Sequence, residues 1–303
     1  RSRRQRQMCI RDRINIDHVY QVDHFVAPGE TLASKGYQQL LGGKGANQSI
    51  ALAAAGAEVR HVGKINQADV SFKQTLIKHE IDCQYLQCTE TPSGHAIIQV
   101  TPSGENAIVL FGGANQEIND KDVMRALDKT KSADWVLTQN ETSCLEETLR
   151  QAHDKHLKVA FNPAPMSESV KSLPFECIDL LIVNEVEAAA LSGQQSLDDI
   201  VTHFKTHWSH AEVIITLGKA GVMMLRKHDT LQVDAFVVDA VDTTAAGDTF
   251  IGYFLAAYSK HADAKQALKR ACAASAISVT REGAAQSIPK REEVDRFLAK
   301  HGS

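Results

Sequence analysis

The chain has 303 residues, of which 43% are hydrophobic and 23% are charged, and its formal net charge is −4. This composition is that of an ordinary soluble globular protein, and the small net charge gives no general attraction to nucleic acid or to anionic membranes. No run approaches the roughly 18 apolar residues that a membrane-spanning helix needs, so neither a membrane nor a nucleic acid is an expected partner. The six cysteines are scattered without zinc-like spacing, which favours a reducing, cytoplasmic location.

The first thirteen residues form a basic segment with six arginines and no apolar period. A basic tail can bind nucleic acid or carry targeting information, but no apolar stretch of a secretory signal follows this one. We expect residues 1–13 to be a non-native leader and residues 14–303 to form one folded domain.

Two polar residues, Asn15 and Asp17, follow this leader two positions apart. On an extended segment this spacing places both side chains on one face, where an amide and a carboxylate together bind vicinal hydroxyl groups well. The same pair is also common at turns, so the hydroxyl-binding interpretation depends on the rest of the chain.

Two stretches alternate without a helical period and predict a small antiparallel sheet. The first, residues 18–40, is divided by Pro28-Gly29. The second, residues 93–112, has the pattern of a hairpin with strands at 95–100 and 106–111. A small sheet attached to an α/β core is typical of a lid over a binding site, and a surface meander is the alternative.

Three glycines within four residues, Gly42, Gly43 and Gly45, precede an Ala-rich helical stretch. Glycine lets the backbone approach a ligand closely, and Lys44 and Asn47 add a cation and an amide. The spacing matches neither a P-loop nor a dinucleotide-binding fingerprint, which argues against P-loop kinases and nicotinamide dehydrogenases. A Gly-rich loop with a solvated lysine is the plainer alternative.

Strand-like and helix-like runs alternate from about residue 58 onward, which predicts a mostly parallel sheet with helices on both faces. The strands are expected at 58–63, 134–139, 158–162, 178–183, 212–217, 221–226 and 231–238. The helices are expected at 43–55, 69–80, 144–156, 196–207, 246–259 and 264–280. Ligands of such sheets bind beyond the carboxyl ends of the strands, where we expect Asn184, Gly218 and Asp242.

Two motifs at these strand ends suit a nucleotide. Asn184 and Glu187 share one face at the start of a helix, where amide and acidic groups suit water-mediated magnesium and phosphate contact. A helix cap explains the same pair equally well. Residues 216–221, Thr-Leu-Gly-Lys-Ala-Gly, form a tight link between strands whose glycines leave room for a purine, and a plain hairpin is the alternative.

The most informative segment is residues 241–250, Val-Asp-Thr-Thr-Ala-Ala-Gly-Asp-Thr-Phe. It opens an apolar-periodic helix, and its small residues leave the unpaired first-turn N–H groups accessible. These groups and the helix dipole form an anion site. Asp248 stands in that first turn, where a carboxylate beside a bound phosphate suits phosphoryl transfer to a hydroxyl. An aspartate that merely caps the helix is the alternative.

Taken together, these segments resemble the ribokinase family of phosphofructokinase-B-type sugar kinases from residue 14 to residue 300. The loops at 42–48 and 242–248 are similar to the two signatures of that family, and residues 161–165 and 280–284 are similar to those of its ribokinases. The resemblance implies an α/β, ribokinase-like fold: a central mostly parallel sheet with helices on both faces and a small antiparallel β-lid. It also implies a homodimer that pairs through the lid.

The resemblance further implies a role for each matching residue. The catalytic base would be Asp248, and the anion hole would comprise Ala245, Ala246 and Gly247. The sugar would be held by Asn15, Asp17, Gly43, Lys44, Asn47, Glu141 and Asp248. The nucleotide and its magnesium would be held by Asn184, Glu187, Thr216, Gly218, Gly221 and Gly247. A potassium ion would be held by Asp242, Thr244, Ser278, Arg281, Gly283 and Ser287.

The implied activity is transfer of the γ-phosphate of ATP to the 5-hydroxyl of D-ribose, with Mg²⁺ and K⁺ as cofactors. A related kinase of deoxyribose, fructose or adenosine is an open alternative. A catalytically inactive sugar-binding regulator is a second one. The intact Asp248, Asn184 and Glu187 favour an enzyme.

The sequence departs from the family pattern at three places. Family members begin with an apolar strand just before the position of Asn15. Here the arginine-rich leader stands instead, so we expect that central strand to be missing and stability to be lowered. Asn66 replaces a glycine, and asparagine tolerates left-handed backbone angles better than most residues. Cys272 stands where an adenine-side His or Asn is expected.

Overall fold

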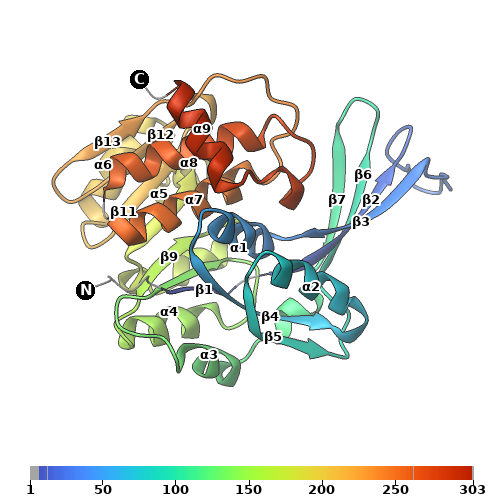
Figure 1. The fold of residues 1–303 in the computed structure, drawn as a ribbon, viewed down its shortest axis with the longest axis horizontal. Coiled ribbons are helices and arrows are strands. Elements are labelled where there is room, and N and C mark those ends of the chain that lie inside the picture. Colours follow the sequence, from blue (N-terminus) through green and yellow to red (C-terminus); the bar gives the residue numbers. More distant parts are fainter. Residues whose placement is uncertain (1–6, 12, 262, 302–303) are drawn as a thin grey trace.

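The computed structural model describes residues 7–11, 13–261 and 263–301. Within these residues the chain forms a nine-stranded sheet flanked by helices, and a four-stranded sheet that projects from one end (Figure 1). The strands of the large sheet, in spatial order, are β13 (Thr230–Val233), β12 (Val222–Leu225), β11 (Glu212–Thr216), β10 (Leu180–Asn184), β9 (Lys158–Asn162), β8 (Trp135–Gln139), β1 (Gln7–Arg11), β4 (Glu58–Asn66) and β5 (Asp82–Thr89). All neighbours are parallel except β11, β12 and β13, which pair antiparallel. The predicted α/β fold is confirmed.

The first central strand is present, so the expectation that it is missing was wrong. Gln7–Arg11 forms β1, which pairs in parallel with β4 on one side and β8 on the other. The side chains of Met8 and Ile10 belong to one hydrophobic core, and that of Cys9 belongs to the other. Three consecutive apolar residues, whose side chains alternate between the two faces, are enough to stabilise this strand, because a central strand is covered on both faces. Composition alone concealed this strand among arginines.

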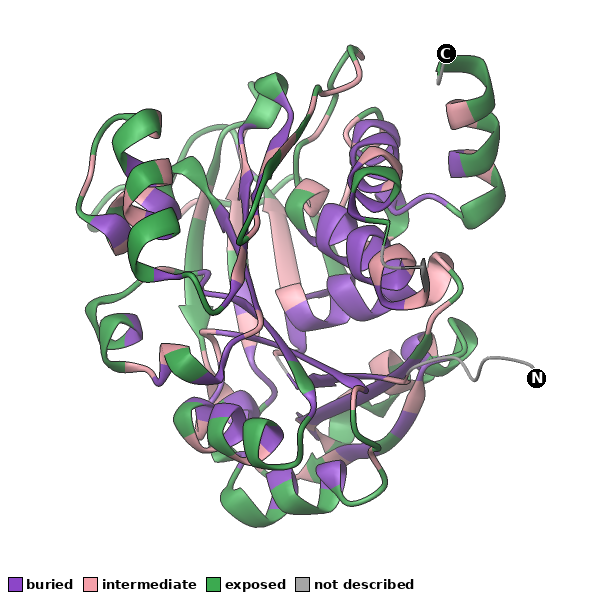
Figure 2. Ribbon diagram, turned by 90° about the vertical axis from the view of Figure 1, so that its left-hand side faces the viewer, coloured by how far each residue is buried: buried purple, intermediate pink, exposed green. Residues whose placement is uncertain are grey.

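Two layers of helices cover the two faces of the large sheet. One face is covered by α1 (Lys44–Ala54), α2 (Val70–Lys78), α7 (Ala246–His261), α8 (Ala264–Ser278) and α9 (Arg291–His301). The other is covered by α3 (Asp120–Leu127), α4 (Leu145–Asp154), α5 (Glu185–Ser192) and α6 (Leu197–His207). Buried residues concentrate on the strands and on the helix faces turned toward them (Figure 2).

The small sheet comprises β3 (Gly36–Gly42), β2 (Asn15–Gln21), β6 (His95–Val100) and β7 (Asn106–Phe111), in that order. The predicted hairpin strands at 95–100 and 106–111 are confirmed. The first two strands are shifted from the expected ranges, because β2 begins at Asn15 and β3 ends at Gly42. One pair, β2 with β6, is parallel, so the sheet is not purely antiparallel as expected.

Several other elements differ from the sequence-based expectation. Residues 235–238 form no strand, so Asp242 does not follow a sheet strand directly. The strand β5 and the helices α3 and α9 were not predicted, and of α5 only the helix start at Asn184 was expected. Their apolar patterns are short or mixed, so the sequence does not distinguish these segments from loops. They are stabilised by neighbouring elements that bury one of their faces.

Glycine at position 252 sets the distance between α1 and α7. A Cβ placed there would lie 2.4 Å from the Cβ of Ala51 and 2.8 Å from the backbone N of Leu52. Only a residue without a side chain permits this approach. The close packing brings the first turns of α1 and α7, which both carry predicted site residues, to the same place.

Candidate active site

A cavity of about 460 Å³ lies at the carboxyl ends of β9, β10 and β11. This is where ligands bind in open parallel sheets. Its lining includes Asn184, Glu187, Thr216 and Gly218 on one side. The other side is lined by Lys44, Thr243, Ala245, Ala246, Gly247 and Asp248. The structure therefore brings two predicted groups, for the nucleotide and for phosphoryl transfer, around one space.

The predicted anion hole is the start of α7. Ala245 adopts a left-handed conformation (φ 59°), which turns the chain sharply into the helix. Next to it, a Cβ added to Gly247 would meet no atom within 4 Å, so space is open above this first turn. The N–H of Ala246 donates to the carbonyl of Thr243 at 3.2 Å, so this one of the three predicted donors already has a partner.

Asp248 lies in the first turn of α7 and is 8% exposed. Its carboxylate accepts hydrogen bonds from two amide side chains of α1. Asn47 Nδ2 donates to Oδ2 at 3.0 Å, and Gln48 Nε2 donates to Oδ1 at 2.9 Å. The candidate base is thus fixed in orientation by the helix that follows the Gly-rich loop.

Asn184 and Glu187 form a reciprocal helix cap. The side chain of Asn184 accepts from the N–H of Glu187 at 2.8 Å, and Glu187 Oε2 accepts from the N–H of Asn184 at 3.0 Å. Burial raises the pKa of Glu187. The capping alternative is therefore realised, and both residues also line the cavity. Gly221 does not line the cavity. A Cβ at this position would lie 2.2 Å from the carbonyl oxygen of Val233, so this glycine allows the chain to pack against β13.

The predicted sugar-binding residues gather where the small sheet joins the core. Asn15 pairs with Gly42 across β2 and β3, and a Cβ on Gly42 would lie 1.9 Å from Asp17 Oδ2. A Cβ on Gly43 would lie 2.9 Å from the backbone N of Asn15. The glycines of the loop are thus required for the close approach of the Asp17 side chain and of the Asn15 backbone to this loop.

Two partly buried carboxyl groups face this region, and both have raised pKa values. Burial raises the pKa of Asp17 to about 6 and that of Glu141 to about 7. The cations Arg13 and Lys44 act in the opposite direction on Glu141. Arg13 Nη1 lies 2.9 Å from Glu141 Oε1, so a residue assigned to the leader takes part in this cluster.

Three polar atoms of the predicted sugar-binding residues have no hydrogen-bond partner in the described part of the chain. They are Asn15 Nδ2, Asn47 Oδ1 and Glu141 Oε2, each buried from solvent. Buried polar atoms are satisfied in nearly all native proteins, since an unpaired one costs free energy. One donor and two acceptors are therefore available to a ligand.

Three residues that sequence analysis missed organise the site. Asn115 is 0% exposed and bridges the root of the small sheet: Oδ1 accepts from the N–H of Ile14, while Nδ2 donates to the carbonyl of Ile14 and to Asn15 Oδ1. Gln48 and Gln139 support Asp248. Gln48 stands inside the Gly-rich motif, but no local pattern marks Asn115 or Gln139, because their partners lie about 100 positions away.

Two segments of the predicted potassium site meet at Asp242, in the loop before α7. Asp242 Oδ1 accepts from the N–H of Thr244 at 2.8 Å, and Oδ2 accepts from the N–H of Gly283 at 2.9 Å. These bonds lower the pKa of Asp242 against the effect of burial. They join the two predicted segments, and carboxylate and carbonyl oxygens are ligands that a hard cation accepts. The side chains of Ser278 and Ser287 are buried, and Arg281 forms an ion pair with Glu293.

The two unusual residues have local explanations. Asn66 has an extended backbone (φ −65°), so no left-handed turn is required there. Its side chain caps the following 3-10 turn and donates to the carbonyls of Glu90 and Thr91. Cys272 is buried in α8 and does not line the cavity described above.

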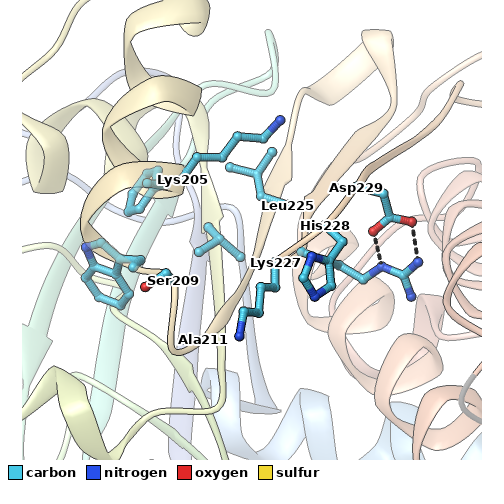
Figure 3. Close-up of a pocket in the computed structure, with 11 residues that line it drawn as sticks. Lys205, Ser209, Ala211, Leu225, Lys227, His228 and Asp229 are labelled. Atoms are coloured by element: carbon cyan, nitrogen blue, oxygen red, sulfur yellow. Dashed lines mark hydrogen bonds and ion pairs between the residues drawn. The ribbon is translucent and has the colours of Figure 1, made fainter.

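A second cavity, of about 140 Å³, lies at the amino end of β11, between α6 and the turn joining β12 to β13 (Figure 3). It is lined by Lys205, Lys227 and His228, while Arg226 pairs with Asp229. The side chains of Lys205 and Lys227 point in different directions and do not converge (Figure 3). None of the predicted site residues lines this cavity.

Two features are absent from the described residues. None of their helices combines the length and the apolar character that crossing a membrane requires. They also contain no group of three or more His, Cys, Asp or Glu side chains arranged to hold a metal ion.

The fold and the site together define a phosphotransferase with an alcohol group as acceptor. The sequence matches the pfkB family of carbohydrate kinases over residues 5–291, and the chain belongs to this family. The resemblance to this family is thereby confirmed.

Individual relatives are similar over nearly the whole chain. A ribokinase of Haemophilus influenzae is 38% identical over 297 residues, covering 94% of this chain and 96% of the relative. A deoxyribokinase of Salmonella typhi is 31% identical, also covering 94% of this chain and 96% of the relative. The crystal structure of a ribokinase from Cryptococcus neoformans in complex with ADP has a TM-score of 0.85 and 30% identity, covering 97% of this chain and 100% of that one.

Proposed function

We propose that the protein transfers the γ-phosphate of ATP to the 5-hydroxyl of D-ribose. The family is one of carbohydrate kinases, the relative with the highest identity named above is a ribokinase, and the structure named above is that of a ribokinase in complex with ADP. The arrangement of the candidate site supports the same activity, because a nucleotide-sized cavity and a cluster of unsatisfied polar groups meet at Asp248.

The unpaired atoms of Asn15, Asn47 and Glu141 carry this proposal. A sugar presents hydroxyl groups that both donate and accept, so it satisfies one amide donor and two oxygen acceptors at once. An apolar or purely anionic substrate leaves at least one of these atoms unpaired. Asp17, next to them on β2, adds a further acceptor when it is ionised.

Phosphoryl transfer passes through a loose transition state, so positioning and charge stabilisation dominate the catalysis. Asp248 orients the attacking hydroxyl and accepts its proton. The first-turn N–H groups of α7, at Gly247 and its neighbours, face the negative charge that develops on the transferred phosphoryl group. Lys44, which lines the same cavity, adds a positive charge there.

Two metal ions belong to this proposal. Asn184 and Glu187 would hold the water shell of Mg²⁺, which supplies charge neutralisation at the phosphates. Thr216 and Gly218 border the nucleotide on the same side. Asp242 and the carbonyls of residues 244, 278, 281 and 283, with Ser287, would hold K⁺, which stabilises the loop that carries the anion hole.

A coupled assay of ADP release tests the proposed activity. We expect D-ribose to give the highest kcat/KM among ribose, deoxyribose, fructose and adenosine, with stimulation by K⁺ and loss of activity when Mg²⁺ is chelated. The position of the phosphate is read by ³¹P and ¹³C NMR. A higher kcat/KM with deoxyribose would favour the activity of the Salmonella typhi relative instead. No sugar-dependent ADP release would indicate an inactive sugar-binding regulator.

We further propose that two copies of the chain pair through the small sheet. Four consecutive residues of β7 are between 48% and 67% exposed: Ile108, Val109, Leu110 and Phe111. Apolar patches of this kind on an extended sheet mark an interaction surface.

The six cysteines are free thiols, consistent with the proposed cytoplasmic location.

Sedimentation velocity tests the pairing. We expect a dimer at micromolar concentration, and we expect the double substitution Ile108→Asp with Leu110→Asp to give a monomer. These two side chains share one face of β7, so both charges would be buried at the interface. Asn106→Asp at the start of the same strand is the matched control and is expected to stay dimeric. A wild-type monomer across this range would contradict the proposal.

A further inference from the structure

The candidate base Asp248 is held by a chain of buried amides that begins at the end of β8. Gln48 Nε2 of α1 donates to Asp248 Oδ1 at 2.9 Å. Gln139 Nε2, at the end of β8, donates in turn to Gln48 Oε1. Both glutamines are 0% exposed. Three elements that lie far apart in the sequence are thus joined by side-chain hydrogen bonds at the catalytic carboxylate.

The order of donors along this chain fixes the direction of each amide. A carboxylate only accepts, so the NH₂ end of Gln48 faces Asp248 and its oxygen faces away. That oxygen then requires a donor, which Gln139 supplies. With this donor in place, a rotation of the Gln48 amide by 180° would bring two donors together and leave Asp248 Oδ1 without its bond.

The second oxygen of Asp248 is held differently. Asn47 Nδ2 donates to Oδ2 at 3.0 Å, and the oxygen of Asn47 is one of the atoms left for a ligand. Asn47 therefore stands between the base and the substrate, whereas Gln48 and Gln139 lie behind the base in the core. Neither glutamine is among the residues expected to contact the sugar or the nucleotide.

We propose that Gln48 and Gln139 are positioning residues of the phosphoryl transfer. Gln139 orients Gln48, and Gln48 locks the Asp248 carboxylate in the one orientation that meets the attacking hydroxyl. This inference rests on the proposed function, because it acts on the base of that reaction. Hydrogen bonds to a charged group are among the strongest in proteins. Because these bonds orient the base and do not contact the substrate, we expect their loss to lower kcat rather than to weaken substrate binding.

The test is a set of steady-state measurements on the full chain with ribose and ATP. We expect Gln48→Met to lower kcat about 10–100-fold, because one bond to a carboxylate is lost, while KM for ribose changes less than about threefold. Gln139→Met is expected to lower kcat in the same direction but less. The double variant is expected to be no worse than Gln48→Met, since both residues act along one line.

A cycle with Asp248→Asn separates positioning from a merely structural role. If Gln48 acts through the base, Gln48→Met will lower the residual kcat of the Asp248→Asn variant by less than about twofold. A structural role instead lowers kcat by the same factor in both backgrounds and moves the urea midpoint and KM as well. Gln84→Met, an exposed glutamine on β5, is the matched control and is expected to leave kcat unchanged.

The outcomes distinguish this inference from the proposed function. A wild type without sugar-dependent ADP release removes the proposed function. A wild type that is active, loses activity in Asp248→Asn and keeps it in Gln48→Met overturns the inference alone. If Gln48→Met shows no cooperative unfolding transition, Gln139→Met, which leaves Gln48 in place, gives the same decision: an unchanged kcat overturns the inference.

Discussion

Replacing Asp248 by asparagine is expected to lower kcat for ribose about 10²–10⁴-fold, the usual contribution of a general base. The amide keeps the size of the side chain but cannot accept the proton of the attacking hydroxyl. KM for ribose is expected to change little, because the unpaired atoms of Asn15, Asn47 and Glu141 remain. The measurement is steady-state ADP release with ribose varied at saturating ATP.

Two further variants make the Asp248 result specific. Asn47 and Gln48 both donate to the carboxylate, so an asparagine there brings one pair of donors together; Asp248→Ala avoids this contact and is expected to lose as much activity. Asp239→Asn, an exposed aspartate in the preceding connection, is expected to be fully active. If either variant at position 248 turned over at near the wild-type rate, the assignment of the base would be wrong.

Replacing Asp17 by asparagine is expected to raise KM for ribose about 10–100-fold and to leave kcat within a few-fold. A hydrogen bond to a charged acceptor contributes about 1.5–3 kcal/mol, and an amide in its place returns only part of this. Isothermal titration with ribose checks the affinity directly. Asp23→Asn, at an exposed bend after the end of β2, is the matched control. An unchanged KM in Asp17→Asn would remove this residue from the sugar site.

The raised pKa values of Asp17 and Glu141 make ribose binding depend on pH. An ionised carboxylate accepts stronger hydrogen bonds from the sugar hydroxyls than a protonated carboxyl group does, so KM for ribose is expected to fall as the pH rises from about 5 to about 8. The pKa of Asp17 is about 6 and that of Glu141 about 7. In Asp17→Asn the lower step is expected to disappear, while the step near pH 7 remains. A KM that is flat over this range contradicts both assignments.

The same two groups have the opposite effect on the stability of the unliganded protein. Their ordinary pKa values are 3.8 and 4.5, so the folded chain holds these protons more tightly than the unfolded chain. Their contribution to the free energy of unfolding is fully present below about pH 4 and is lost as the pH rises to about 7. Above about pH 7 these groups contribute least to the stability of the unliganded protein, and ribose binds most tightly. Ribose is therefore expected to stabilise the protein most in this pH range.

Much of the fold and the candidate site was accessible from the sequence, because the signals are local. Glycines at 42, 43 and 45, the small residues before Asp248, and the pair Asn184 and Glu187 each lie within a few positions of one another. Such spacings report on backbone conformation and helix starts directly. The alternating strands and helices likewise predicted the parallel sheet.

The strand β1 shows where local reasoning failed. Its five residues, Gln7–Arg11, lie in a run of arginines, and the sequence was interpreted as lacking a strand. Burial between β4 and β8 decided otherwise, since hydrogen bonding on both edges and packing on both faces are properties of the sheet and not of the segment.

The sequence by itself determined the family and the layered architecture, and it predicted the residues for a nucleotide and a sugar. Only the tertiary structure decided which polar atoms lack partners, that Asn115 holds Asn15, and that Gln139 and Gln48 hold Asp248. The reason is physical: a backbone motif is specified by neighbours in the chain. The hydrogen bonds of a buried side chain are instead specified by residues 91 to 200 positions away, which only the packed core brings within 3 Å.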